Sequence, residues 1–178
     1  MTAQCGRELQ AVRSVTAAFR MTNKPAPTGC SPFVPLLLEP LRLFSECHGD
    51  KAPERDNKHG SGLGAAPAAA WRVKVLEAVA DKYTGMVMEL LATVRAMDEA
   101  LKKRKHAKKA QHATTDKGGG GGKGEKLSDA DKIGLQLWLD AHAFGKDLAE
   151  EGMDLAGCAA YQQLVAAVAP FEAHLGRS

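Results

Sequence analysis

A long stretch without proline constrains the fold of this chain more than any other feature. Residues 68–113 contain no proline and a single glycine, Gly85. Within them nine apolar residues recur at alternating steps of three and four, the heptad spacing that places side chains on one face of a helix. We call these residues the seam: Val73, Leu76, Ala80, Tyr83, Val87, Leu90, Val94, Met97 and Leu101. The pattern predicts one long helix over 68–113 that packs along the seam.

The positions that flank the seam indicate what packs against it. A two-stranded coiled coil keeps its flanking positions charged, but here they include Val79, Met86 and Leu91. A stripe of this width is typical of a helix that several neighbours cover in a bundle. We therefore favour a bundle or rod core, and an independent homodimeric coiled coil is the alternative.

The aliphatic composition agrees with a helical fold. The chain has 178 residues, with thirty alanines and nineteen leucines against ten valines and a single isoleucine. Alanine and leucine lose little on entering a helix, whereas β-branched residues suit a pleated sheet. We predict an all-α fold, an elongated bundle or rod of four to five helices with one long central helix, in a single helical domain over 1–178.

The remaining segments divide the chain before and after the long helix. Residues 4–48 predict the first two helices, separated by Pro25 and Pro27; the second has Ser31 as its N-cap and Pro40 as an interior kink. Residues 49–67 are polar and contain several glycines, which predicts a disordered loop. Residues 114–127 predict a flexible Gly/Lys linker.

Residues 128–175 predict the last two helices. Ser128 and Asp131 have the spacing of a capping box at the start of the first, and Gly152 is suited to end it. The second helix is expected over 156–175, with a bend near Pro170.

The polar residues predict no catalytic chemistry. The glycine run before Lys123 lacks the residues and the preceding strand of a phosphate-binding loop. The six histidines have no paired-ligand spacing, and the acidic pair Glu150–Glu151 is expected to be solvated at a helix end. We predict a protein that is not an enzyme, with no catalytic residue, no cofactor and no metal site.

The lack of a secretory signal pattern and the wide spacing of the cysteines favour a cytosolic setting. Residues 1–13 lack the apolar segment of a secretory signal, and no apolar stretch is long enough to span a membrane. The four cysteines are widely separated, so we expect reduced thiols.

The net charge of +3 conceals a basic run. Residues 102–126 carry a net charge of +7, and the rest of the chain carries −4. Cations at a helix C-terminus complement the macrodipole and stay solvated; contact with an anionic membrane or an acidic protein is the other interpretation. Nucleic acid is disfavoured, because no aromatic residue interleaves the run. The candidate basic patch is Lys102, Lys103, Arg104, Lys105, Lys108 and Lys109.

Several segments resemble subunit 2 of the conserved oligomeric Golgi complex. The resemblance runs over most of residues 12–170, in order and spacing, and covers only the C-terminal portion of the longer family subunit. The block Ser128–Asp140 is its most specific part. The segments that carry it are Phe19-Arg20-Met21-Thr22-Asn23, Ser31-Pro32-Phe33-Val34, Leu38-Glu39-Pro40-Leu41, Lys82-Tyr83, Val94–Glu99 and Ser128–Asp140.

This resemblance implies a function that composition and spacing do not provide. It implies a non-enzymatic subunit of a tethering complex, peripheral on the cytoplasmic face of the Golgi membrane and acting in intra-Golgi retrograde transport. Its partners would be the other subunits of the complex, with SNARE, small GTPase or anionic membrane contacts in addition. The alternative from the residues alone is a basic-tailed helical adaptor that binds an anionic membrane surface or nucleic acid.

Overall fold

The computed structural model describes residues 9–20, 24–48, 65–111 and 127–175. Within these ranges every regular element is a helix, so the predicted all-α fold is confirmed. The predicted loop and linker lie outside the described residues, apart from residues 65–67 and 127. The elements in chain order are η1 (Ala11–Arg13), α2 (Ser14–Phe19), η2 (Val34–Leu36), α3 (Glu39–His48), α4 (Ala65–Gln111), α5 (Asp129–Glu150), α6 (Ala159–Val168) and η3 (Ala169–His174).

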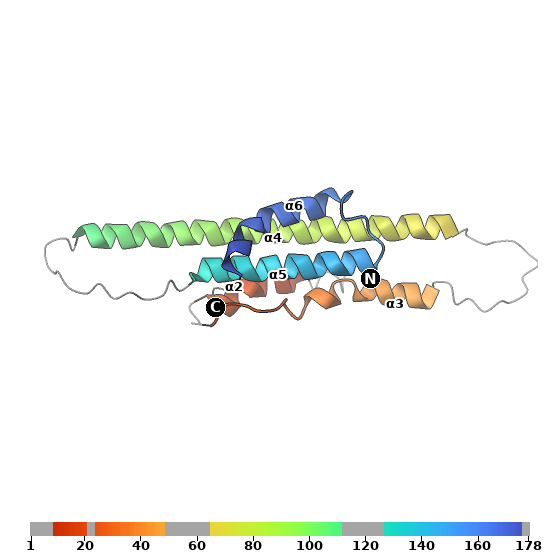
Figure 1. The fold of residues 1–178 in the computed structure, drawn as a ribbon, viewed down its shortest axis with the longest axis horizontal. Helices are drawn as coiled ribbons and strands as arrows, with labels where there is room; N and C mark the ends of the chain where they lie inside the picture. The colour runs from red at the N-terminus through yellow and green to blue at the C-terminus, as the bar shows by residue number, and fades with distance from the viewer. Residues whose placement is uncertain (1–8, 21–23, 49–64, 112–126, 176–178) are drawn as a thin grey trace, which may run out of the picture.

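The helices form an elongated bundle along α4, which is the predicted long helix (Figure 1). Helix α5 runs beside α4 and is the most enclosed element, since it contacts α2, α4, α6, η2 and η3. One continuous apolar core joins residues from α2, α3, α4, α5 and α6. The C-terminal end of α4 runs on past the first turn of α5 (Figure 1).

Helix α5 begins and ends as the sequence predicts. The Ser128 hydroxyl accepts a hydrogen bond from the backbone N–H of Asp131 at 3.1 Å, and the Asp131 carboxylate accepts one from the backbone N–H of Ser128 at 3.3 Å. This reciprocal pair is the predicted capping box. At the other end Gly152 has a φ of 85°, a left-handed conformation that suits glycine and stops the helix.

The predicted second helix differs from the structure at its start. The hydroxyl of Ser31 does not cap a helix, because it donates to Asp140 of α5 instead. A 3₁₀ turn, η2, precedes α3, which begins at Glu39, so Pro40 lies in the first helical turn and not at an interior kink. Proline is well accommodated there, since the first-turn N–H groups have no intrahelical partner.

The last predicted helix changes type where its proline lies. Helix α6 ends at Val168, and the chain continues as the 3₁₀ helix η3, with Pro170 in its first turn. The single helix predicted over 156–175 is therefore two elements, and the junction between them lies next to Pro170, where the bend was expected.

Tyr83 in the middle of the seam gives a first testable prediction. Its side chain is fully buried, with its ring centroid 4.6 Å from that of Phe144, and its hydroxyl has no hydrogen-bond partner within the described part of the chain. Burial raises the pKa of this phenol well above its usual value. Because a buried unpaired hydroxyl costs free energy, we expect Tyr83→Phe to raise the free energy of unfolding by about 1 kcal/mol. Urea denaturation measures the change, and a loss of that size would mean that the hydroxyl is hydrogen-bonded.

Candidate functional site

The seam on α4 packs mainly inside the protein. Its central residues are buried in the core that α4 forms with the other helices, whereas both ends emerge from it. Val73 is 43% exposed, Leu101 is 56% exposed and Met97 is half-buried. A partner could therefore reach the seam only at its ends. The buried members are Leu76, Ala80, Tyr83, Val87, Leu90 and Val94.

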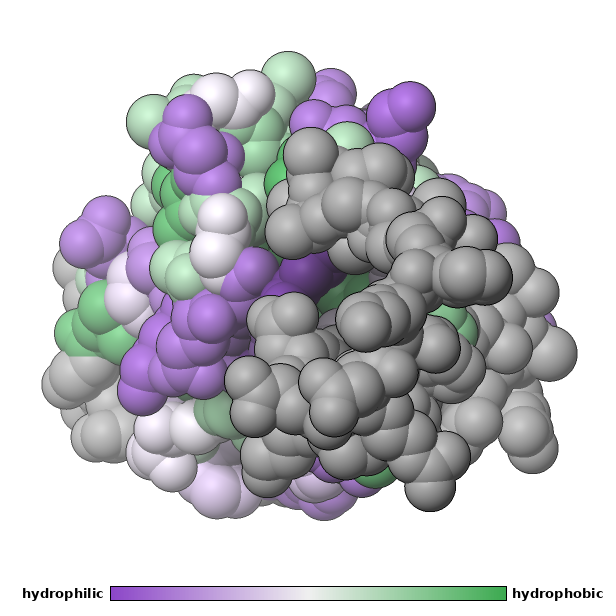
Figure 2. Space-filling view, turned by 90° about the vertical axis from the view of Figure 1, so that its right-hand side faces the viewer, coloured by the Kyte–Doolittle hydropathy of each residue, from purple (hydrophilic) through white to green (hydrophobic). Residues whose placement is uncertain are grey.

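The N-terminal end of the seam belongs to a mixed surface. Figure 2 views the molecule from the end where α4 begins, and hydrophilic and hydrophobic residues alternate over its coloured part. Trp71 is 41% exposed there, but its ring packs on Phe44 of α3 with centroids 4.9 Å apart. This contact joins α3 to α4. The exposed apolar side chain of Trp71 thus already has a packing role within the bundle.

The basic run begins where the bundle ends. Lys102, Lys103 and Arg104 are exposed, and the Lys102 ammonium lies 2.7 Å from the Asp98 carboxylate. A hydrogen bond to Asp98 raises the pKa of Lys102, with smaller contributions from Asp131 and Glu99. The backbone of α4 continues to Gln111 and so includes Lys105, Lys108 and Lys109, whose side chains lie outside the described part of the structure.

A fully buried carboxylate in α5, Asp140, was not singled out by the sequence analysis. One of its oxygens accepts hydrogen bonds from the Ser31 backbone N–H at 2.6 Å and from the Gln136 side-chain amide at 2.8 Å. Its other oxygen accepts the Ser31 hydroxyl at 2.7 Å. Burial raises the pKa of Asp140, and the hydrogen bonds from Ser31 and Gln136 oppose that rise.

Asp140 belongs to a row of α5 side chains that hold the extended segment 24–31. Gln136 donates to the backbone carbonyl of Gly29 at 2.9 Å, and the Lys132 ammonium donates to that of Lys24 at 2.6 Å. An irregular segment has few backbone hydrogen bonds of its own, so side chains from α5 supply them. Asp140 and Gln136 are thereby committed to internal contacts.

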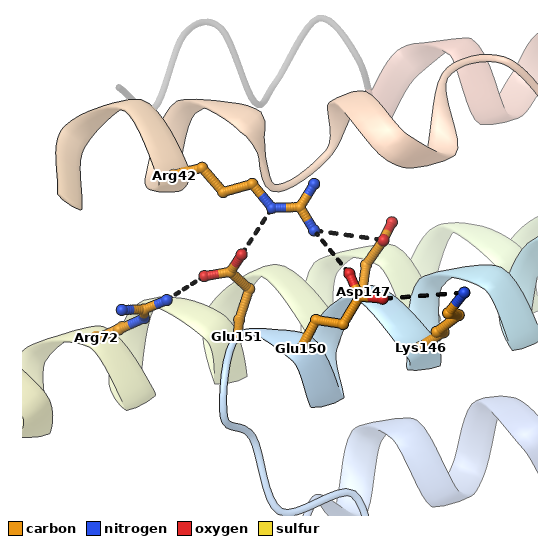
Figure 3. Close-up of polar contacts among 6 residues, drawn as sticks. All are labelled: Arg42, Arg72, Lys146, Asp147, Glu150 and Glu151. Carbon is orange, nitrogen blue, oxygen red and sulfur yellow. Dashed lines mark hydrogen bonds and ion pairs between the residues drawn. The ribbon is translucent and has the colours of Figure 1, made fainter. Parts of the chain in front are cut away.

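A second polar cluster joins three helices at the end of α5 (Figure 3). Glu151 lies between Arg42 of α3 and Arg72 of α4, and its side chain is only 7% exposed. The Arg42 Nε donates to Glu151 at 2.7 Å, and an Arg72 N–H donates to the other Glu151 oxygen. Asp147 and the more exposed Glu150 lie 3.4 Å and 3.8 Å from Arg42. The prediction that Glu150 and Glu151 are both solvated is wrong for Glu151, because two arginines that are distant in sequence enclose it.

The Glu151 cluster predicts a pH-dependent stability. Burial disfavours the charged form of Glu151, but the hydrogen bonds from Arg42 and Arg72 outweigh this effect, so the pKa of Glu151 is lowered from its usual value. An acid with a lowered folded-state pKa stabilises the fold above its unfolded pKa, and this contribution disappears as the pH falls through the folded-state value. The side chains of Arg42 and Arg72 are 33% and 38% exposed, so solvent screens their attraction to Glu151. We therefore expect Glu151→Gln to lower the free energy of unfolding by only about 1 kcal/mol at neutral pH.

The matched control for that variant is Glu150→Gln. The Glu150 side chain is 55% exposed, so its loss should cost less than about 0.5 kcal/mol. Urea denaturation at neutral and acidic pH measures both variants. Equal losses of unfolding free energy for the two variants, or a loss for Glu151→Gln that persists in acid, would contradict a stabilising role of the ion pairs with Arg42 and Arg72.

The described residues form one further hollow and show no sign of a metal site or a membrane-spanning helix. A hollow of about 220 Å³ lies between α2, the segment 30–33 and α5, with Phe19, Phe33 and Gln136 in its wall. Among the residues that the structure describes, no three His, Cys, Asp or Glu side chains gather as metal ligands would. Nor does any helix in those ranges have the length and apolar character needed to cross a bilayer.

Comparison with known proteins gives one consistent family. The sequence model of the family "COG complex component, COG2, C-terminal" matches residues 1–141. Conserved oligomeric Golgi complex subunit 2 of Homo sapiens is 32% identical over 92% of this chain, and the Arabidopsis thaliana subunit is 29% identical over 92%. The subunit of Dictyostelium discoideum is 28% identical over 97% of the chain. No solved structure is significantly similar.

The matches differ greatly in length from this chain. It spans between 17% and 20% of the length of these three relatives, so it corresponds to one region of a much larger subunit. Within the chain, in contrast, the family match takes in α2, α3, α4 and the first half of α5. We conclude that the chain belongs to the family of the C-terminal region of COG2, a component of the COG complex.

Proposed function

We propose that this chain is a non-enzymatic structural part of a Golgi vesicle-tethering complex. It would act at the cytoplasmic face of the Golgi membrane in intra-Golgi retrograde transport, and its partners would be the other subunits of the complex. The observation that carries the proposal is the family match over residues 1–141, since the matched relatives are named as subunit 2 of the conserved oligomeric Golgi complex.

The internal use of the polar residues supports a structural function. Asp140 is hydrogen-bonded to Ser31 and Gln136, and Glu151 is enclosed by Arg42 and Arg72. Both clusters join elements that are far apart in sequence, so both contribute to holding the bundle together. What the chain offers a partner is helical surface, which suits contact between subunits.

Co-expression with the other subunits of the complex tests this proposal. We expect an affinity tag on the 178-residue chain to recover at least one other subunit in a constant ratio. Asp140→Asn is a suitable control, because the amide keeps the buried hydrogen bonds and leaves the surface unchanged. Recovery of no subunit by a chain whose circular dichroism spectrum is that of a folded helical protein would contradict the proposal.

A further inference from the structure

We propose that the projecting end of α4 is a docking site for an acidic amphipathic helix of another protein. We call this segment, Leu101–Gln111, the α4 tip. The inference rests on the proposed function and deepens it, since it names a surface and the chemistry of the partner. It rests on two observations: the C-terminal end of the seam is exposed although its middle is buried, and positive charge is concentrated beside that end.

The seam changes from buried to exposed within two helical turns. Val94 is 5% exposed, Met97 is half-buried and Leu101 is 56% exposed, although all three lie on the same helix face. The ribbon shows α5, which begins at Asp129, starting beside the C-terminal part of α4 and not at its end (Figure 1). Figure 1 shows α4 continuing beyond that point. The tip therefore continues the apolar face along which the bundle packs, past the start of α5.

The fifteen residues directly after α4 contain no large apolar side chain that could pack against Leu101. Residues 112–126 read HATTDKGGGGGKGEK, with no apolar side chain larger than alanine. A second helix with leucine or a similar residue at three- and four-residue spacing would fit against Met97 and Leu101 in the way that a seam residue fits a neighbouring helix.

The charge of the α4 tip defines the sign of its partner. Lys103 and Arg104 are exposed, and neither forms an ion pair with a described residue, whereas Lys102 is paired with Asp98. Lys105, Lys108 and Lys109 add three more cations to the same helical segment. Acidic residues at the flanks of the incoming helix would pair with these cations and would accelerate its association.

A membrane surface fits this segment less well than a helix does. A helix that lies in a membrane interface buries a broad apolar face with several large side chains. From Leu101 to Gln111 the sequence has only one apolar residue larger than alanine, Leu101 itself. One leucine at the end of a seam is suited to a helix–helix contact, where Met97 and Leu101 together form the apolar strip.

Binding of a synthetic helix to the full 178-residue chain tests the inference. The probe is a heptad-repeat peptide with leucine on its seam and glutamate on its flanks, and a second peptide has glutamine in place of the glutamates. We expect the glutamate peptide to bind more tightly at low salt than at high salt. Lys103→Glu with Arg104→Glu should weaken binding by at least about tenfold, and Leu101→Ser should weaken it by about fivefold.

A matched variant separates local from overall charge. Lys74→Glu with Lys82→Glu makes the same change in net charge at exposed positions of α4 outside the tip, so binding should stay within about twofold of the wild type. Equal loss in both double variants, or no effect of Leu101→Ser, would reduce the interaction to non-specific attraction of a polyanion and overturn the proposal. So would binding to phosphatidylserine vesicles but to neither peptide.

The same variants distinguish this inference from the proposed function. If the wild type and the Lys103/Arg104 variant recover the other subunits equally well, the docking site is wrong and the proposed function stands. If the chain recovers no subunit but binds the glutamate peptide through Leu101, Lys103 and Arg104, the proposed function fails and the docking site stands.

Discussion

Asp140→Ala is expected to lower the free energy of unfolding by about 3 kcal/mol. The substitution removes both acceptor oxygens and leaves the Ser31 backbone N–H and hydroxyl without their partner, in a place where the Asp140 side chain is fully buried. Gln136 keeps its contact with Gly29, so its amide loses one of two hydrogen bonds. The segment 24–31 should detach from α5. Urea denaturation measures the loss of stability, and hydrogen exchange at the Ser31 amide should become faster in the same variant.

The isosteric variant Asp140→Asn separates shape from charge. The asparagine oxygen can accept from the Ser31 N–H and Gln136, and its amide can donate to the Ser31 hydroxyl, so we expect a change of less than about 1 kcal/mol. Because burial raises the pKa of Asp140 in the folded state above its usual value, protonation of Asp140 stabilises the native state. This contribution is full below the unfolded-state pKa and is lost as the pH rises through the folded-state pKa. The wild type should therefore gain stability relative to Asp140→Asn on acidification. A large loss for Asn at neutral pH would show that the charge is required.

Gly145→Ala is expected to lower the free energy of unfolding by about 2 kcal/mol. A Cβ atom at Gly145 would overlap the hydroxyl and ring of Tyr161, which is buried between α5 and α6. Gly134→Ala would meet the ring of Phe171 in η3, but that ring is only half-buried and can swing toward solvent. We expect a smaller loss of about 1 kcal/mol there.

Gly85→Ala is the matched control for these two variants. Nothing lies within 4 Å of a Cβ built at Gly85, and the residue is exposed in the interior of α4. Alanine is the better helix former, so this variant should gain about 0.5–1 kcal/mol in the same thermal or urea denaturation. Stabilisation at Gly145 as well would mean that α6 does not approach α5 as closely as described.

Local patterns in the sequence were sufficient to predict most of the helical architecture. Heptad spacing identified α4, the Ser128–Asp131 spacing identified the start of α5, and Gly152 identified its end. Each of these signals acts over a few residues, through helix periodicity or through backbone hydrogen bonds at a helix end. These signals do not depend on which other segment of the chain lies nearby, so they can be recognised in the amino-acid sequence without knowledge of the fold.

Contacts between distant segments account for what the sequence did not predict. Ser31 bonds to a carboxylate 109 residues away, and this contact replaces the capping role expected for its hydroxyl. Glu151 is enclosed for a similar reason, since Arg42 and Arg72 come from two other helices. An acid at a helix end has the same local signature whether it is solvated or paired across a bundle, so composition alone cannot separate the two.

The candidate docking site was partly visible in the sequence. The basic run from Lys102 onward was evident from charge alone, and the seam was evident from spacing. What required the structure is that the middle of the seam is buried by the chain itself, whereas Leu101 emerges next to the cations. Substitutions at Leu90 or Val94 would therefore test folding, whereas those at the α4 tip test the proposed binding.

Hydrogen exchange of the 178-residue chain, alone and mixed with the other subunits of the tethering complex, tests the central claim most directly. If the chain is a helical scaffold that binds partner subunits through its projecting helix end, amides from Leu101 to Gln111 should exchange more slowly in the mixture. Amides around Leu76–Val94 are already protected by the core, so they should change little. Unchanged exchange along the whole of α4 in the presence of all other subunits would contradict the claim.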